Sequence, residues 1–267
     1  MRMASETPLR GMQVLVTRPA HQAEAFCTAL EQDGARAIRF PAIAIGPPPD
    51  ARAVAEVAAG LAGFHLAIFI SANAVQRGLP QLCPDGNWPA GTAIAAIGSR
   101  TAEELTAWGL RVDLVPARDH NSEVLLALPG LADLQGRRVL IVRGDGGREI
   151  LAATLRERGA EVVYAEVYRR ELPQVDVAPL LRAWDEHGLD LVTVTSGQTL
   201  RNLWQLLGPD GQPLLQSTPL LLASEAVRRV ALELGCRGPL EVADDATDAA
   251  MLAALRRWRR SEEGNKA

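Results

Sequence analysis

The two halves of this chain carry the same sequence pattern at a fixed offset of 125 residues. Residues 14–38 (VLVTRPAHQAEAFCTALEQDGARAI) align without a gap on residues 139–163 (VLIVRGDGGREILAATLRERGAEVV), and the same offset relates residues 66–71 to residues 191–196. Self-similarity along a whole chain indicates two copies of one structural unit, so it constrains the architecture before any single motif does. We therefore expect two similar domains, with a ligand-binding cleft between them.

Composition excludes several classes of protein. The chain has 267 residues, about two domains by the length prior, and its formal net charge of −4 is a poor match for nucleic acid. Cys27, Cys83 and Cys236 are scattered, without a C-x-x-C pair, which argues against a disulfide framework or a metal site and favours a reducing cytosol. Since no apolar run is long enough for a signal peptide or a membrane span, we expect a cytoplasmic protein with no membrane partner.

Short apolar runs alternate with helical patterns along the chain. The runs that read as strands buried on both faces are residues 14–17, 67–70, 93–97, 139–142, 191–194 and 220–223. Each is followed by a small or polar turn and then by apolar residues at helical spacing. Strand, turn and helix in repetition predict an α/β fold with parallel sheets and right-handed crossovers.

The strand-to-helix turns are the predicted ligand site, because ligands of such sheets bind outside the carboxyl ends of the strands. These turns are rich in Ser, Thr and Gly, which cap helices and leave backbone donors for an anion. Each residue alone is also explained as a simple helix cap. The turn residues are Thr17, Arg18, Ser71, Ala72, Asn73, Gly98, Ser99, Thr101, Arg143, Gly144, Gly147, Arg148, Thr195, Ser196, Gly197 and Ser224.

Two segments break the strand-turn-helix pattern at equivalent positions of the repeat. Residues 40–46 (FPAIAIG) and residues 163–170 (VYAEVYRR) both look extended. Two such segments side by side would form a two-stranded linker between the domains.

The chain resembles the uroporphyrinogen-III synthase family. The resemblance runs over nearly the whole chain, and the order and spacing of its motifs carry it: VLVTRP at 14–19, FISANAV at 69–75, AAIGSRTAEEL at 95–105, VPARDHNSEVLLAL at 115–128, VRGDGGREILAATLRERGAEV at 142–162, EVYRR at 166–170 and VTSGQTLRNL at 194–203.

The resemblance implies two flavodoxin-like domains that exchange their first strand-helix unit. Residues 1–40 and 171–267 would form one domain and residues 41–170 the other, with linker strands near 40–46 and 163–170. A tandem arrangement divided near residues 129–130 is the alternative. The exchanged form is favoured because the extended, proline-flanked segments lie near residues 40 and 170.

The family's reaction implies a lyase of tetrapyrrole biosynthesis, on the way to heme, siroheme, cobalamin or chlorophyll. The substrate is hydroxymethylbilane, a linear tetrapyrrole with eight carboxylates, which loses water and closes through a spiro intermediate that inverts the last ring. Positioning supplies much of such catalysis, so no cofactor or metal is expected. We expect a monomer, although nothing in the sequence fixes the oligomeric state, and transient contact with hydroxymethylbilane synthase is left open.

The resemblance also assigns roles to particular residues. The donors for the substrate carboxylates would be Ser71, Ser99, Thr101, Ser122, Thr195, Ser196 and Ser224, with Arg18, Arg143 and Arg148 as charges. Arg143 and Arg148 have an alternative role in salt bridges with Asp145, Glu149 or Glu166, and Gly144 and Gly147 have one in a tight turn. Tyr168, in EVYRR, would donate the proton from a position facing the cleft, since a phenol is protonated at neutral pH. Its alternative is packing against the hinge.

Two other functional classes fit the sequence in part. A two-domain protein that binds a small anion without chemistry has the same architecture, although such proteins are usually exported. A nucleotide-dependent transferase would use residues 144–147 (GDGG) as a phosphate loop, but that run is neither G-x-G-x-x-G nor a Walker A motif.

Overall fold

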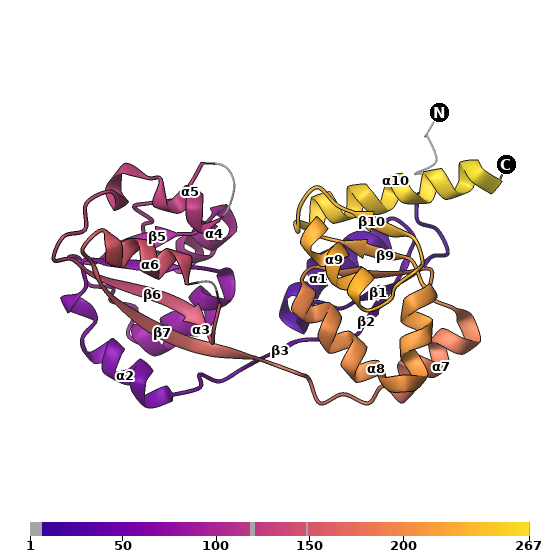
Figure 1. The fold of residues 1–267 in the computed structure, drawn as a ribbon, viewed down its shortest axis with the longest axis horizontal. Helices are drawn as coiled ribbons and strands as arrows, with labels where there is room; N and C mark the ends of the chain where they lie inside the picture. Colours follow the sequence, from indigo (N-terminus) through magenta and orange to yellow (C-terminus); the bar gives the residue numbers. More distant parts are fainter. Residues whose placement is uncertain (1–6, 118–120, 148, 267) are drawn as a thin grey trace. The chain divides into compact units, whose positions relative to one another are not determined.

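The chain folds into two compact units (Figure 1). The computed structural model describes residues 7–117, 121–147 and 149–266. Unit 1 comprises Met1–Ala44 and Glu171–Ala267, and unit 2 comprises Ile45–Arg170. The chain therefore passes from unit 1 into unit 2 and back again. The first crossing falls at Ala44, a few residues beyond the expected division before Pro41.

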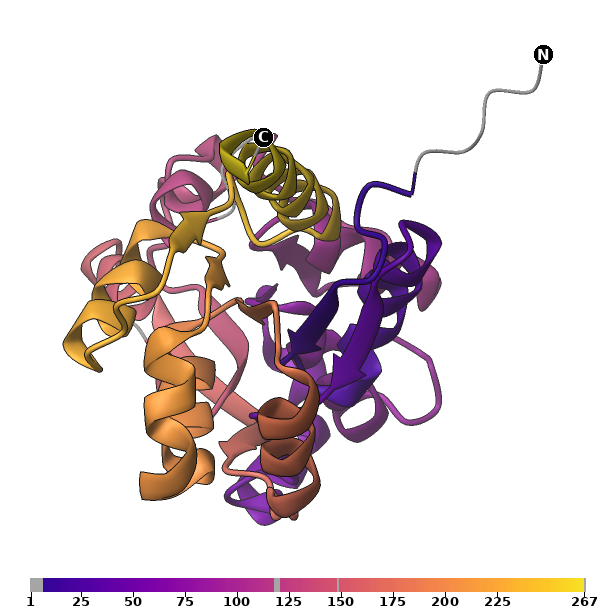
Figure 2. The same cartoon turned by 90° about the vertical axis from the view of Figure 1, so that its right-hand side faces the viewer.

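Unit 1 is a parallel five-stranded sheet with helices on both faces. Its strands are β1 (Gln13–Val16), β2 (Arg36–Arg39), β8 (Leu191–Val194), β9 (Leu220–Leu222) and β10 (Leu240–Val242). The sheet order β2-β1-β8-β9-β10 is the 2-1-3-4-5 order of flavodoxin-like folds. One face of the sheet is covered by α1 (Ala20–Gln32) and α10 (Asp248–Lys266). The other face is covered by α7 (Ala178–His187), α8 (Gly197–Ser217) and α9 (Glu225–Glu233). Figure 2 shows this unit from the front.

Unit 2 has a sheet of the same kind. Its strands are β3 (Ala44–Gly46), β4 (Leu66–Phe69), β5 (Ala93–Ala96), β6 (Arg138–Gly144) and β7 (Glu161–Glu171), in the order β3-β7-β6-β4-β5. Strands β7, β6, β4 and β5 are parallel. One face is covered by α2 (Ala51–Ala59), α3 (Ala72–Leu82) and α4 (Ser99–Ala107), the other by α5 (Ser122–Leu126) and α6 (Ile150–Glu157). Short 3₁₀ helices occupy Leu61–Gly63 and Pro129–Leu131.

The internal repeat explains the likeness of the two sheets. The segment β6-α6-β7 is the second copy of β1-α1-β2, and β8 and β9 are the second copies of β4 and β5. Each sheet combines strands of both copies, because β1 pairs with β8 and β4 pairs with β6. The sheet of unit 1 ends with β10. At the equivalent position of unit 2, the described residues form only an isolated bridge between Ala95 and Leu114. The predicted α/β class with parallel sheets is confirmed.

Local sequence accounts for most of the elements. Strands β4 and β8 are buried along their whole length, as expected when helices cover both faces of a parallel sheet. Serines cap α3, α8 and α9. Helix α8 is interrupted at Gly208, whose φ of 61° is in the left-handed region and which precedes Pro209.

The two segments predicted to be extended, residues 40–46 and 163–170, differ from the expectation in strand length and in the strands with which they pair. Strand β7 begins at Glu161, and its first part pairs with β6 as an ordinary strand of the sheet. Of residues 40–46 only β3 is a strand, next to β7. Strand β6 also runs to Gly144, so Arg143 and Gly144 end a strand and do not lie in the predicted turn; pairing with β7 continues to that point.

Candidate functional site

The predicted site residues lie at the carboxyl ends of the parallel strands, in one set for each unit. The set in unit 1 is Thr17, Arg18, Thr195, Ser196, Gly197 and Ser224. The set in unit 2 is Ser71, Ala72, Asn73, Gly98, Ser99, Thr101, Ser122, Arg143, Gly144, Gly147 and Tyr168. Arg148 lies outside the described residues.

Three of the serines are helix caps. The hydroxyl oxygens of Ser71, Ser196 and Ser224 accept hydrogen bonds from the backbone N–H groups three residues later, at 3.1, 3.1 and 3.4 Å. Capping uses an oxygen lone pair and leaves the hydroxyl hydrogen to be donated elsewhere. The first turns of these helices also carry the positive end of the helix dipole, which favours an anion. Capping and anion binding are therefore compatible at these positions.

Two threonines are enclosed in the protein. Thr17 is fully buried, and its hydroxyl donates to the carbonyl of Thr193 at 2.7 Å, while the Thr193 hydroxyl donates to the carbonyl of Leu15 at 3.0 Å. These bonds tie β1 to β8. Thr101 is buried in α4.

Arg18 is held inside unit 1. Only 3% of the residue is exposed, and its guanidinium donates to Asp248 at the start of α10 and to the carbonyl of Ala246 at 3.1 Å. It also lies 4.8 Å from the centre of the Phe26 ring. The charge of Arg18 is thus used to join β1 to α10.

Arg143, at the end of β6, lies in a network of its own. It is 3% exposed, its Nη1 donates to Glu149 at 3.1 Å, and its Nε donates to the carbonyl of Gly144 at 3.2 Å. Glu166 is 3.7 Å from Nε. The expected alternative of structural salt bridges is therefore observed for this residue.

Tyr164 completes this network. Its ring centre lies 4.6 Å from the Arg143 guanidinium, and its hydroxyl donates to Glu149. The hydrogen bond from Tyr164, followed by that from Arg143, lowers the pKa of Glu149 below its ordinary value of 4.5. Burial, then the bond to Glu149, raises the pKa of Tyr164 above 10.0. At neutral pH the pair is a carboxylate and a neutral phenol.

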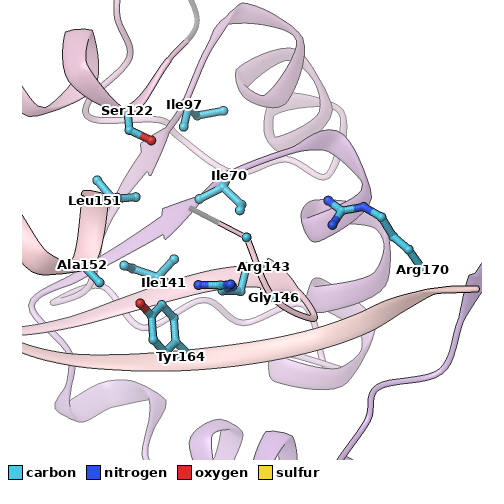
Figure 3. Close-up of a pocket in the computed structure, with 11 residues that line it drawn as sticks. Ile70, Ile97, Ser122, Ile141, Arg143, Gly146, Leu151, Ala152, Tyr164 and Arg170 are labelled. Carbon is cyan, nitrogen blue, oxygen red and sulfur yellow. The ribbon is translucent and has the colours of Figure 1, made fainter. Parts of the chain in front are cut away.

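A cavity of about 200 Å³ opens beside Arg143, wholly within unit 2 (Figure 3). Drug-sized ligands occupy sites of roughly 300–1,000 Å³, so this cavity has room for one part of a larger molecule. The residues that line it are Ile70, Ile97, Ser122, Ile141, Arg143, Gly146, Gly147, Leu151, Ala152, Tyr164 and Arg170. Of the predicted residues, it brings together Ser122, Arg143 and Gly147.

Tyr168 is fully buried, although the resemblance placed it facing a cleft. The cause is a β-bulge: Arg143 pairs with Glu166 but the next residue, Gly144, pairs with Tyr168, so that Val167 is an extra residue on β7. Strand alternation would otherwise put Tyr168 on the face of Tyr164. The bulge turns Tyr168 onto the same face as Val167, toward α3.

The Tyr168 hydroxyl has two polar neighbours. It lies 3.3 Å from the Ser71 hydroxyl, and Nη2 of Arg170 donates to it at 3.3 Å. Gly144 provides the space for the ring, since a Cβ atom there would be 2.5 Å from Tyr168 Cε2. This close approach is the structural role of Gly144. The Asp145 carboxylate, for its part, accepts from the backbone N–H of Arg170 at 3.0 Å.

Tyr164 contacts Arg143, and Arg170 contacts Tyr168. The sequence had assigned no role to either Tyr164 or Arg170. The chain has only two tyrosines, and both lie on β7. The available signal was the repeat itself, in which Tyr164 takes the position of Arg39. Aligning the copies for their differences would have pointed to it.

Metal ligands and membrane spans are the remaining features that bear on the class of site. Across residues 7–117, 121–147 and 149–266, no three His, Cys, Asp or Glu side chains are grouped to hold a metal ion. None of the helices described is long and apolar enough to cross a bilayer.

Comparisons with known proteins agree with one another. The family model for uroporphyrinogen-III synthase HemD matches residues 24–253. The uroporphyrinogen-III synthase of Escherichia coli K12 is 38% identical over 248 residues, which cover 91% of this chain and 100% of that protein. That of Synechococcus elongatus is 31% identical over 263 residues, covering 96% and 98%.

Solved structures extend the likeness to the fold. A crystal structure of mutant uroporphyrinogen III synthase from Thermus thermophilus aligns with a TM-score of 0.60 at 21% identity, covering 92% of this chain and 98% of that one. The enzyme of Helicobacter pylori 26695 aligns with a TM-score of 0.58 at 15% identity, covering 92% and 99%. With the family model and the sequence relatives, these findings confirm the predicted resemblance, and the chain belongs to the uroporphyrinogen-III synthase family.

Proposed function

We propose that this chain cyclises hydroxymethylbilane to uroporphyrinogen III, with loss of water and inversion of the last pyrrole ring. The observation that carries the proposal is the match to the entire Escherichia coli synthase at 38% identity. The product would feed tetrapyrrole biosynthesis. The strand-end donors described above suit a substrate with many carboxylates, since a protein of net charge −4 must bind such an anion through local groups.

The proposed carboxylate donors are the strand-end turns of the two sets, most of whose residues are at least partly exposed, together with Arg143, which is buried but lines the cavity. In unit 2 they are the turns at Ser71, Ala72, Asn73, Gly98, Ser99, Ser122, Gly147 and Arg143; in unit 1 they are Thr195, Ser196, Gly197 and Ser224. Thr17, Arg18 and Thr101 are assigned to the protein interior instead: all three are buried and none of them lines the cavity beside Arg143, and the first two are hydrogen-bonded within unit 1.

Tyr168 is the proposed proton donor, acting through Ser71. Arg170 has only donors, so the phenol oxygen accepts from it and the phenol hydrogen is directed to Ser71 Oγ. In this proposal the Ser71 hydroxyl protonates the substrate hydroxyl, which leaves as water, while Ser71 recovers a proton from Tyr168. After ring closure the proton lost from the pyrrole carbon returns along the same path. Proton transfer of this kind typically contributes about 10²–10⁴-fold.

The deciding experiment supplies enzymatically generated hydroxymethylbilane and separates the type I and type III products. We expect the type III isomer, with no added cofactor and after exhaustive chelation. The uncatalysed reaction, run in parallel without protein, gives type I. Only type I product at high protein concentration would contradict the proposal and would leave a small-anion binding protein as the alternative.

We further propose that the protein acts as a cytoplasmic monomer, with transient contact with hydroxymethylbilane synthase as an open question. Light scattering after size-exclusion chromatography measures the mass directly, and a value near 28.6 kDa is expected. A stable dimer would contradict the proposed state.

A further inference from the structure

The cavity of unit 2 combines an apolar floor with a single buried guanidinium. Ile70 and Ile97 follow β4 and β5, Ile141 lies on β6, and Leu151 lies on α6, so the floor is built from the sheet edge and one helix (Figure 3). Arg143 lies at one side of this floor. A ligand that matches such a site is a flat apolar ring with a carboxylate on it.

Arg143 has donors to offer to that carboxylate. Its Nε is bound by Gly144 and its Nη1 by Glu149, whereas within the described part of the chain Nη2 has no acceptor. Nη2 lies 3.3 Å from the place that a Cβ on Gly147 would take, and Gly147 has a φ of 130°, so the absence of a side chain there keeps the approach to Nη2 open. Arg170, which also lines the cavity, adds a second positive charge.

The direction of Arg143 is set by Tyr164 and Glu149. Tyr164 supports the guanidinium with its ring and holds one oxygen of Glu149, whose other oxygen holds Nη1. A side chain held at its face and at one edge has little freedom to turn, which lowers the entropy lost on binding. The other nearby acid, Glu166, accepts from the backbone N–H of Gly146 at 3.3 Å.

We propose that this cavity is a subsite for one pyrrole ring of the tetrapyrrole, with Arg143 Nη2 binding its carboxylate and Tyr164 and Glu149 as positioning residues. The subsite rests on the proposed function for the identity of its ligand. Its chemistry is that of a pyrrole bearing acidic side chains, so it can be tested with a single ring.

The test titrates ¹⁵N-labelled full-length protein with a monopyrrole that carries one acetate and one propionate, followed by amide shifts of residues around the cavity. The dimethyl ester of the same pyrrole is the matched ligand control. We expect the acid to shift the amides of Gly146 and Gly147 and the ester to bind about tenfold more weakly, as for loss of a charge-assisted hydrogen bond. Absence of shifts with millimolar acid, or equal binding of the ester, would overturn the subsite.

Variants separate positioning from folding. Arg143→Gln should weaken binding of the pyrrole about ten- to a hundredfold, and Tyr164→Phe, which keeps the ring but loses the hydroxyl, about three- to tenfold. The control is Arg201→Gln, which removes an exposed ion pair with Glu233 in unit 1 and should leave binding unchanged. Unfolding curves confirm that each variant is folded; binding by folded Arg143→Gln equal to that of the native chain contradicts the proposal.

Turnover of hydroxymethylbilane distinguishes the subsite from the function on which it rests. If the native chain makes type III product, both variants should raise KM and change kcat little. Type III product with an unchanged KM in Arg143→Gln would reject the subsite and keep the function. Pyrrole binding that depends on Arg143, without type III product, would reject the function and keep the site as a binding site for acidic pyrroles.

Discussion

Arg18 and Arg143 occupy the same position in the two copies of the repeat and are equally buried, yet they differ in what their charge does. The Arg18 guanidinium donates its hydrogen bonds to Asp248 and to the carbonyl of Ala246. Arg143 is fixed by Glu149 and keeps Nη2 beside a cavity. In the first copy the arginine links the end of β1 to the start of α10, and in the second copy it remains available to the proposed ligand.

Two differences between the copies account for this. In unit 1, Arg39 pairs with Glu24 and Glu31, whereas its counterpart Tyr164 binds one oxygen of Glu149, the counterpart of Glu24, and Arg143 binds the other. The aromatic ring beside Arg18 is Phe26, whose counterpart in unit 2 is the smaller Leu151 that lines the cavity. In unit 2 the aromatic side chain beside the arginine therefore comes from β7, and the smaller Leu151 lines the cavity.

The largest expected effect is on stability, at Arg18. Arg18→Met should lower the free energy of unfolding by about 3 kcal/mol, because it leaves Asp248 without its buried partner. Urea unfolding measures the change. Arg201→Met is the control; its ion pair with Glu233 is exposed, so a loss below about 1 kcal/mol is expected. Equal losses in the two variants would remove the distinction between Arg18 and a surface arginine.

Next in size is the effect of Tyr168→Phe on rate. Turnover should fall roughly ten- to a hundredfold with KM nearly unchanged, since the variant loses a proton donor and no carboxylate ligand. The counterpart of Tyr168 in the first copy is the buried Ile43, so an apolar side chain is compatible with this position. Steady-state kinetics on hydroxymethylbilane provide the measurement. An unchanged kcat would show that Tyr168 only packs.

A smaller effect is expected when unit 2 is made to resemble unit 1. Leu151→Phe should fill the cavity and raise KM roughly tenfold, while the free energy of unfolding changes by less than about 1 kcal/mol because the ring enters existing space. Leu155→Phe is the matched control on the same helix: Leu155 is fully buried in the core, so the larger ring should cost about 1–3 kcal/mol and leave KM alone. The reverse pattern would contradict a ligand in the cavity.

The smallest expected effect is on the titration of Glu149. Its pKa is lowered first by the bond from Tyr164, so its stabilising contribution is present above pH 4.5 and is lost as the pH falls through the lowered pKa. Tyr164→Phe should raise that pKa part of the way back toward its ordinary value, which ¹³C NMR of the carboxyl carbon can follow. Tyr168→Phe, which does not touch Glu149, should leave the titration in place. A titration unaffected by Tyr164→Phe would mean that Arg143 alone holds the carboxylate.

The sequence was sufficient for the α/β class and for six of the strands because these signals are local. Strands such as β4 and β8 are continuous apolar runs, and the repeat shows that both sheets must be alike. Serine caps were equally readable, since the cap and the helix it starts are adjacent in the chain. The ends of β6 and β7 were harder to predict, because pairing between distant segments decides where each strand stops.

The surroundings of Tyr168 and Arg143 could not be predicted for a physical reason. A single extra residue, Val167, reverses the side of the sheet on which Tyr168 lies, and no residue type marks that bulge. The cavity depends in turn on the volume of Leu151 and on the ring of Tyr164, from two different elements. Only tertiary packing brings these side chains together.

The exchange of strands between the copies also sets an order of events at the ribosome. Ile45–Arg170 is complete once residue 170 has emerged, whereas β1 must wait for β8, with contacts such as Gln13 to Asp190 spanning 177 residues. Until then the apolar face of α1, including Phe26 and Leu30, lacks β8, β9 and α10, which complete its core. We therefore expect the internal unit to fold during synthesis and the nascent amino-terminal segment to be the part of the chain that most needs protection by chaperones.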